Sequence, residues 1–141
     1  MKTIIHDYWS VKVGNNESME MYLETIYLLE SNHGHAHVVD IAKQLSVSKP
    51  SVTKAIKQLK AQGYVNTEKY GTITLTEKGK EKSEEIYTNH QLLELFLAHS
   101  LDLSAEQASI NACKIEHVLS EEMIEAIKSY LKKNNIDISK L

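Results

Sequence analysis

The sequence predicts a mainly α-helical protein with a small β-hairpin, arranged as an N-terminal winged helix-turn-helix followed by an α-helical domain. Three observations support this prediction: two helical patterns separated by a short turn, two β-prone runs directly after them, and helical patterns over the remaining chain. At 141 residues the chain is long enough for one domain or two small units. We expect a first domain over residues 1–76, which includes an N-terminal extension, and a second over residues 77–141.

Helical spacing of apolar side chains predicts a first helix over Glu17–Glu30, and the polar stretch 32–34 ends it. The next stretch, His35–Val39, is partly apolar and could pair as a strand. Its histidines belong to the tract HGHAH (His33, His35, His37), a composition that metal-binding tracts share. We favour an ordinary loop and strand for this tract.

A helix-turn-helix is predicted after that strand. Ile41–Leu45 is a short helix, residues 46–48 form a turn, and Pro50–Gln62 is a longer helix. Pro50 occupies a first-turn position, where its missing N–H costs nothing, and Gly63 ends the helix. The apolar positions that would pack the two helices together are Ile41, Ala42, Leu45, Val47, Val52, Ile56 and Leu59.

The rest of the chain continues the winged-helix pattern and then becomes helical. Two β-prone runs, Tyr64–Tyr70 and Thr72–Thr76, predict a hairpin, which at this place is a wing. Thr76 is expected to cap a long helix that runs to about Ala98. Two further helices are predicted over Ser104–Leu119 and Ser120–Lys133, because each begins at a serine followed by acidic residues.

Charge is distributed unevenly along the chain. The net charge is −3, yet residues 41–67 contain no Asp or Glu and carry five lysines. All 16 basic residues are lysines, so a phosphate-binding surface would use point charges rather than bidentate guanidinium groups. We expect contacts to double-stranded DNA from Ser48, Lys49, Pro50, Ser51, Thr53, Lys54 and Lys57. The alternative is a solvated lysine face on an ordinary helical hairpin. A homodimer on a roughly palindromic site would supply adequate affinity.

Several classes of protein are disfavoured. No apolar run approaches the ~20 residues of a membrane span, and no signal-peptide pattern opens the chain, so we expect a cytoplasmic protein without a membrane partner. The single cysteine, Cys113, is a packed thiol, a nucleophile or a ligand. As a nucleophile it would have His117 as its base, but no third orienting group is visible. We therefore expect neither an enzyme nor a small-molecule substrate.

Three predicted helices each offer a set of metal-ligand side chains. Cys113, Glu116 and His117 have the i, i+3, i+4 spacing that places them on one helix face. The alternative for this trio is a half-buried thiol beside a solvent-facing Glu–His pair. The other sets are His90 with Glu94 and Met21 with Glu24. Helical bundles build metal sites from inward-facing side chains of this kind.

Five motifs occur in one order: SMEMYLETIYLLE, IAKQLSVSKPSVTKAIKQL, LTEKGK, NHQLLELFL and CKIEHVLSEE. In the order and spacing of these motifs the chain resembles the diphtheria toxin repressor and manganese transport regulator family of metal-activated transcriptional repressors. The resemblance extends over Ser18–Lys133 and is to the short form of the family, without an SH3-like domain. The resemblance implies a homodimer that binds operator DNA, with one or two divalent ions per subunit as corepressor. Binding of the metal would join the first helix to the dimerisation helices, and the genes repressed would serve metal uptake.

The resemblance also assigns ligands by position. Met21, Cys113, Glu116 and His117 match the metal site of the iron-responsive branch, His90 and Glu94 match the neighbouring ion site, and Glu24 matches a carboxylate ligand of the manganese branch. That manganese branch has Asp in place of Met21 and Glu in place of Cys113. The chain also departs from the iron branch at Ser109, where that branch has a histidine ligand.

The donor set bears on the choice of metal. Thiolate and thioether are soft donors and Mn²⁺ prefers oxygen and nitrogen, so Met21 and Cys113 favour Fe²⁺ over Mn²⁺, and they also favour Co²⁺, Ni²⁺ or Zn²⁺. We expect Fe²⁺ as the corepressor, then Mn²⁺, then another ion. A remaining alternative is a winged-helix regulator that senses a small molecule or an oxidant through Cys113 without metal.

Overall fold

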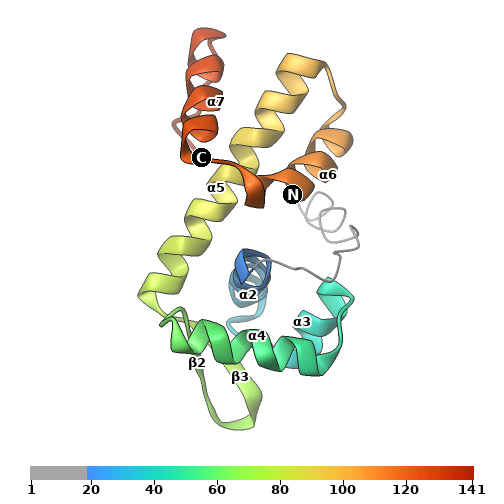
Figure 1. Ribbon diagram of the computed structural model, residues 1–141, viewed down its shortest axis with the longest axis vertical. Helices are drawn as coiled ribbons and strands as arrows, with labels where there is room; N and C mark the ends of the chain where they lie inside the picture. Colours follow the sequence, from blue (N-terminus) through green and yellow to red (C-terminus); the bar gives the residue numbers. More distant parts are fainter. Residues whose placement is uncertain (1–18) are drawn as a thin grey trace. The chain divides into compact units, whose positions relative to one another are not determined.

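A computed structural model describes residues 19–141, and helices dominate this part of the chain (Figure 1). The elements are α2 (Met19–His33), β1 (Ala36–His37), α3 (Val38–Leu45), α4 (Lys49–Ala61), β2 (Val65–Thr67), η1 (Lys69–Gly71), β3 (Thr72–Leu75), α5 (Glu77–Leu101), α6 (Ala105–Ile115), η2 (Glu116–Val118) and α7 (Glu121–Lys133). The predicted fold class, a winged helix-turn-helix followed by a helical domain, is confirmed. Within residues 19–141, none of the helices is long and apolar enough to cross a membrane.

The described chain divides into two compact units, and the division falls inside α5 between Glu85 and Ile86. The first unit holds the winged helix-turn-helix and the beginning of α5. The second unit holds the remainder of α5 together with α6, η2 and α7.

The first unit contains a three-stranded antiparallel sheet in the order β1-β3-β2. Val65 pairs with Leu75 and Thr67 with Ile73, so β2 and β3 form the predicted wing, which projects beyond α4 in Figure 1. β1 pairs with the other edge of β3, as the stretch before the helix-turn-helix suggested.

The helix-turn-helix begins earlier than predicted. Val38 and Val39 are β-branched and favour a strand locally, but the ladder with β3 ends at His37 and the chain turns directly into α3. α3 ends at Ser46, which has a left-handed φ of 55°. Ser48 then caps α4, and its hydroxyl accepts a hydrogen bond from the Ser51 amide at 3.3 Å.

The core of the first unit forms between α2, the two helices of the helix-turn-helix and the sheet. The largest of its fully buried apolar side chains are Leu23, Ile26, Ile41, Val52, Leu59, Val65 and Ile73. Of the apolar positions predicted to pack the helices, Val47 alone is only half-buried.

Gly79 allows the start of α5 to approach the strand region closely. A Cβ at Gly79 would lie 2.0 Å from the carbonyl oxygen of Tyr64. The same carbonyl accepts a hydrogen bond from the Thr76 amide at 3.0 Å, and the Thr76 hydroxyl in turn accepts one from the Gly79 amide at 3.1 Å. Thr76 is therefore the N-cap that the sequence predicted, and only glycine fits one turn after it.

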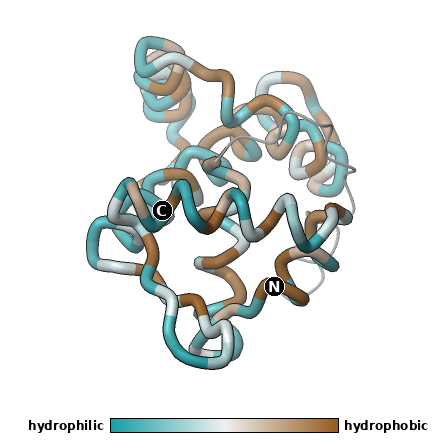
Figure 2. Tube along the Cα trace, turned by 60° about the horizontal axis from the view of Figure 1, so that its bottom comes forward, coloured by the Kyte–Doolittle hydropathy of each residue, from teal (hydrophilic) through white to brown (hydrophobic). Residues whose placement is uncertain are grey.

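The second unit is built from α5, α6 and α7. Its core consists of Leu92, Leu93, Leu97, Ala108, Ala112, Ile124, Ile127 and Leu131. The rings of Phe96 and Tyr130 pack edge to face at the border of this core, with centroids 5.2 Å apart. The helices of both units alternate hydrophobic and hydrophilic residues, as expected when one face of each is buried (Figure 2).

The predicted helix over Ser104–Leu119 is too long. α6 begins after Ser104, which caps it as expected, but it ends at Ile115, and residues Glu116–Val118 form a separate 3₁₀ turn. Ile115, with φ −109° and ψ −15°, departs from regular α geometry, and Leu119 is already extended, with ψ 138°. Ser120, with ψ 160°, then accepts a hydrogen bond from the Met123 amide and caps α7.

Candidate metal centre and nucleic-acid interface

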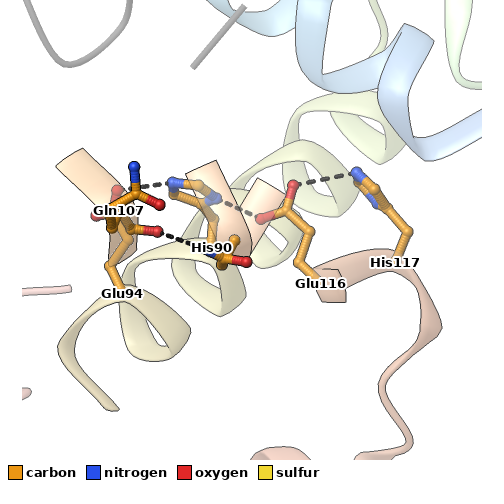
Figure 3. Close-up of polar contacts among 6 residues, drawn as sticks. His90, Glu94, Gln107, Glu116 and His117 are labelled. Carbon is orange, nitrogen blue, oxygen red and sulfur yellow. Dashed lines mark hydrogen bonds and ion pairs between the residues drawn. The ribbon is translucent and has the colours of Figure 1, made fainter. Parts of the chain in front are cut away.

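His90 is the centre of a buried polar network in the second unit (Figure 3). It lies on α5 with Glu94 one turn later, and its Nε2 is 2.9 Å from Glu94 Oε1. Its Nδ1 is 2.5 Å from Glu116 Oε2, in the 3₁₀ turn after α6. The imidazole, 3% exposed, is therefore held between two carboxylates.

Glu116 extends the network to His117. Its second oxygen, Oε1, lies 3.0 Å from His117 Nε2. Glu116 and His117 both belong to η2, so the shared α-helical face predicted for them with Cys113 is wrong. Through Glu116, the two carboxylates of Glu94 and Glu116 and the two imidazoles of His90 and His117 form one contiguous set.

The carboxylates determine the charge of His90. Burial lowers the pKa of His90, but hydrogen bonds and charge interactions with Glu116 and Glu94 outweigh it and raise the pKa to about 9. Burial also raises the pKa of Glu94, but hydrogen bonds with His90 and Ser109 and the charge of His90 together outweigh this effect, so the Glu94 pKa lies below its ordinary value. At neutral pH the network thus contains an imidazolium that donates to a carboxylate on either side.

Cys113 lies in the last turn of α6 and is 4% exposed. Ser109, one turn before it on the same helix, is buried as well. A thiol at this depth is poorly accessible to an oxidant in solution, which disfavours direct oxidant sensing. Gln107, which the sequence prediction omitted, is also drawn among the residues of this polar network in Figure 3. The one sequence signal that could have identified Gln107 is its position in the first turn of α6, on the same helix as Ser109 and Cys113.

Met21 and Glu24 belong to the first unit, and both lie on α2. Glu24 is 1% exposed and Met21 9%, so neither is an ordinary solvated surface residue. A carboxylate at that depth needs a compensating partner or ion, because burying an isolated charge is costly.

The network in the second unit fits a divalent cation. Imidazole, carboxylate and thiol are all competent transition-metal ligands, and the first two converge within hydrogen-bonding distance. The field of Glu94 and Glu116 already stabilises a positive charge, the imidazolium of His90. A metal ion bound here would add a fixed cross-link between the carboxylate and imidazole groups of α5 and η2.

The second functional surface is the outer face of α4. All seven residues predicted to contact DNA lie there or at its cap and are exposed: Ser48, Lys49, Pro50, Ser51, Thr53, Lys54 and Lys57. The Thr53 hydroxyl also makes a hydrogen bond within the helix, because its Oγ1 donates to the Lys49 carbonyl at 3.0 Å. The opposite face of α4 is buried through Val52, Ile56 and Leu59. Lys60, which is not among the seven, donates a hydrogen bond to Thr67 Oγ1 of the wing at 2.8 Å.

Comparison with known proteins decides the family. A sequence model described as the N-terminal DNA-binding domain of the iron-dependent repressors matches residues 16–73. A second one, for the metal-binding and dimerisation domain of these repressors, matches residues 76–138. This chain belongs to the iron-dependent repressor family.

Individual members of the iron-dependent repressor family are similar over most of the chain. An uncharacterised HTH-type transcriptional regulator of Methanocaldococcus jannaschii is 41% identical over 84% of this chain and 95% of its own. The HTH-type transcriptional regulator MntR of Lysinibacillus sphaericus is 41% identical over 87% of this chain and 89% of its own. The crystal structure of IdeR from T. acidophilum has a TM-score of 0.76 and 25% identity. That match covers 88% of this chain but only 57% of the solved one.

Proposed function

We propose that this iron-dependent repressor family member represses transcription as a homodimer on double-stranded operator DNA, with a divalent metal as corepressor. One observation supports the metal dependence most directly: the buried network of His90, Glu94, Glu116 and His117 lies within the region that matches the family's metal-binding and dimerisation domain. We propose a regulatory rather than a catalytic role for these residues.

The proposed ligands divide into two groups. His90, Glu94, Glu116 and His117 are supported by their mutual contacts, and Cys113 by its burial three and four residues before Glu116 and His117. Met21 and Glu24 are proposed from the sequence resemblance, together with their burial on α2. The metal, when bound, would supply a positive charge that holds several ligands at once.

Fe²⁺ is our preferred corepressor and Mn²⁺ the next. Sulfur donors from Cys113 and Met21 favour the softer ion, whereas the oxygen and nitrogen donors accept either. Affinity alone ranks Zn²⁺ above Fe²⁺, so selection in the cell would depend on geometry and on metal availability. One or two ions per subunit are compatible with the number of donors.

DNA recognition is assigned to α4 and its cap. Lys49, Lys54 and Lys57 offer cationic contacts to phosphates, while Ser51 and Thr53 are short enough for a close approach to base edges. Two α4 helices of a homodimer would contact two half-sites, which predicts a roughly palindromic operator. We propose that the genes controlled serve metal uptake.

The test is operator binding by the purified protein, first with a chelator and then with Fe²⁺ or Mn²⁺ added without oxygen. We expect weak binding with chelator and restored binding with metal, and Fe²⁺ should act at the lower concentration. Glu116→Gln should require more metal for the same binding, whereas the exposed Glu125→Gln is a matched control in the same unit. Operator affinity that does not respond to chelation would refute the metal-corepressor proposal and support metal-free sensing.

A further inference from the structure

Two histidine rings in the first unit, neither of them part of the network around His90, lie against each other. The ring centroids of His35 and His37 are 4.7 Å apart, and the ring planes meet at 79°. His35 is exposed and His37 half-buried, so solvent and dissolved ions can reach the pair. The sequence alone favoured an ordinary loop and strand for this tract, without a role for the imidazoles.

The backbone sets this arrangement of the rings. Ala36, between the two histidines, is 0% exposed and pairs with Ile73 of β3, while His37 pairs with Thr72. Ala36 is directed inward, and the side chains alternate at the next position, so His37 of β1 is directed outward. His35 lies in the bend just before β1, and its ring contacts that of His37. The ladder with β3 thus fixes the backbone at one of the two histidines before any ligand binds.

His37 is not used for helix capping. It occupies the N-cap position of α3 with extended angles, φ −121° and ψ 152°, but its side chain makes no capping hydrogen bond. Histidine is not a favoured N-cap residue, so helix stability gives little reason for an imidazole here. Its ring is instead turned toward that of His35.

We propose that His35 and His37 form a bis-imidazole binding site for a late first-row divalent ion, of the class Ni²⁺, Cu²⁺ or Zn²⁺. With a metal–nitrogen distance of about 2.0–2.1 Å, a ring centre lies roughly 3.2 Å from the ion. Two such rings at a ligand angle of 90–109° would have centres about 4.5–5.2 Å apart. The observed 4.7 Å lies in this interval, and the steep angle between the planes keeps the rings from clashing.

The donor set separates this site from the one proposed for the corepressor. Two neutral nitrogen donors suit Ni²⁺, Cu²⁺ and Zn²⁺ and bind Mn²⁺ poorly, and water would fill the remaining positions. The positive end of α3 opposes a cation here, but Asp40 in the first turn of that helix partly offsets it. The bound ion would tie the residue before β1 to the last residue of β1, which is the N-cap of α3.

Equilibrium dialysis of the full chain against Ni²⁺ tests the site. The variant His35→Asn/His37→Asn should bind one Ni²⁺ fewer per chain than the wild type. Asn is a favoured N-cap residue, so the substitution at position 37 should preserve α3. The matched control, His33→Asn/His99→Asn, removes two other exposed histidines and should bind as many ions as the wild type.

A thermal readout checks the same proposal without counting ions. Ni²⁺ should raise the unfolding temperature of the wild type more than that of His35→Asn/His37→Asn, because a ligand of the folded state stabilises it. The single variant His35→Asn, at an exposed position, should show the same loss. Equal ion counts in the wild type and the double variant, or an equal loss in the control pair, would overturn the proposal.

Discussion

His90 Nδ1 lies 2.5 Å from Glu116 Oε2 and joins α5 to the 3₁₀ turn that follows α6. Glu94 approaches the other ring nitrogen, so the imidazole has a carboxylate at each end. This geometry makes His90 a buried cation in the metal-free protein, with a pKa raised to about 9. The contact between His90 and Glu116 therefore makes the stability of the folded protein depend on pH.

The metal-free protein should lose stability as the pH rises from about 6.5 to about 9. In this window the folded state retains the His90 proton whereas the unfolded chain, with an ordinary histidine pKa, has released it. The stabilisation that the His90 proton gives to the folded state is complete below pH 6.5 and absent above pH 9. Between these values the free energy of unfolding would fall by at most about 1.4 kcal/mol per pH unit. Urea unfolding at several pH values in the presence of a chelator measures it.

Two variants isolate the source of this slope. Glu116→Gln removes one of the carboxylates that hold the proton, so the fall in stability between pH 6.5 and 9 should become shallower. His99→Gln alters an exposed histidine on the same helix and should leave the slope unchanged. A slope that is identical in the wild type and Glu116→Gln would mean that another group titrates.

Local signals explain how much of the fold was predictable. α4 was predicted as Pro50–Gln62 and runs over Lys49–Ala61, because a first-turn proline and Gly63 mark its ends in the sequence. The end of α6 was not predictable in this way. Apolar periodicity continues through residues 116–119 without a break, and no Gly or Pro lies within residues 112–119 to mark the end at Ile115.

The candidate site was predictable as a set of residues but not as a geometry. Spacing placed His90 and Glu94 one turn apart, and the structure confirms their contact. The contact of His90 with Glu116 joins residues 26 positions apart, and no local pattern indicates it. The paired rings of His35 and His37 likewise depend on the burial of Ala36 against β3, which is a tertiary effect.

Exchange of the sulfur donors should change the preferred metal. In Met21→Asp/Cys113→Glu, oxygen ligands replace the thioether and the thiolate, so the operator-binding response should shift from Fe²⁺ toward Mn²⁺. The midpoint metal concentration for DNA binding measures this for each ion. The matched control Met123→Leu changes an exposed methionine of α7 and should keep the wild-type order. If the double variant retains that order, sulfur does not determine selectivity.

Removal of two lysines from α4 should weaken DNA binding in a salt-dependent way. Lys54→Ala/Lys57→Ala would remove up to two phosphate contacts per subunit. The slope of log K against log salt should therefore become less steep by about 2 per subunit. Lys132→Ala/Lys133→Ala, at exposed positions on α7, is the control for loss of charge alone. An unchanged salt slope in the α4 variant would place the contact surface elsewhere.

Gly79→Ala should destabilise the winged unit, although alanine is usually the better helix residue. In an open helix this substitution would stabilise by about 1 kcal/mol. Here the new Cβ would lie 2.0 Å from the Tyr64 carbonyl oxygen, so the start of α5 must shift away from a hydrogen-bonded backbone group. We expect a net loss of about 1–3 kcal/mol in the free energy of unfolding. Lys80→Ala, at an exposed position next along the helix, should have little effect.

The wing tip contains a side chain in an unfavourable conformation. Tyr70 has φ 69° and ψ 21°, the left-handed region, and its side chain is 97% exposed. A bulky residue pays a steric cost there that glycine does not, and no burial compensates it. Strained, exposed residues of this kind concentrate at functional positions. Lys69 adds a positive charge next to it, at the end of the hairpin that extends beyond α4.

Tyr70→Gly should therefore separate stability from DNA binding. Glycine relieves the left-handed strain, so the free energy of unfolding should stay the same or rise by up to about 1 kcal/mol. If the tyrosine packs against the DNA when α4 is docked, the variant should bind operator DNA several-fold more weakly at the same metal concentration. Tyr70→Asn, which also tolerates this backbone conformation, should behave similarly in both measurements. Unfolding by urea and operator titration of the same samples test both expectations. Unchanged DNA affinity would confine DNA recognition to α4, because the wing tip would then contribute nothing through its aromatic ring.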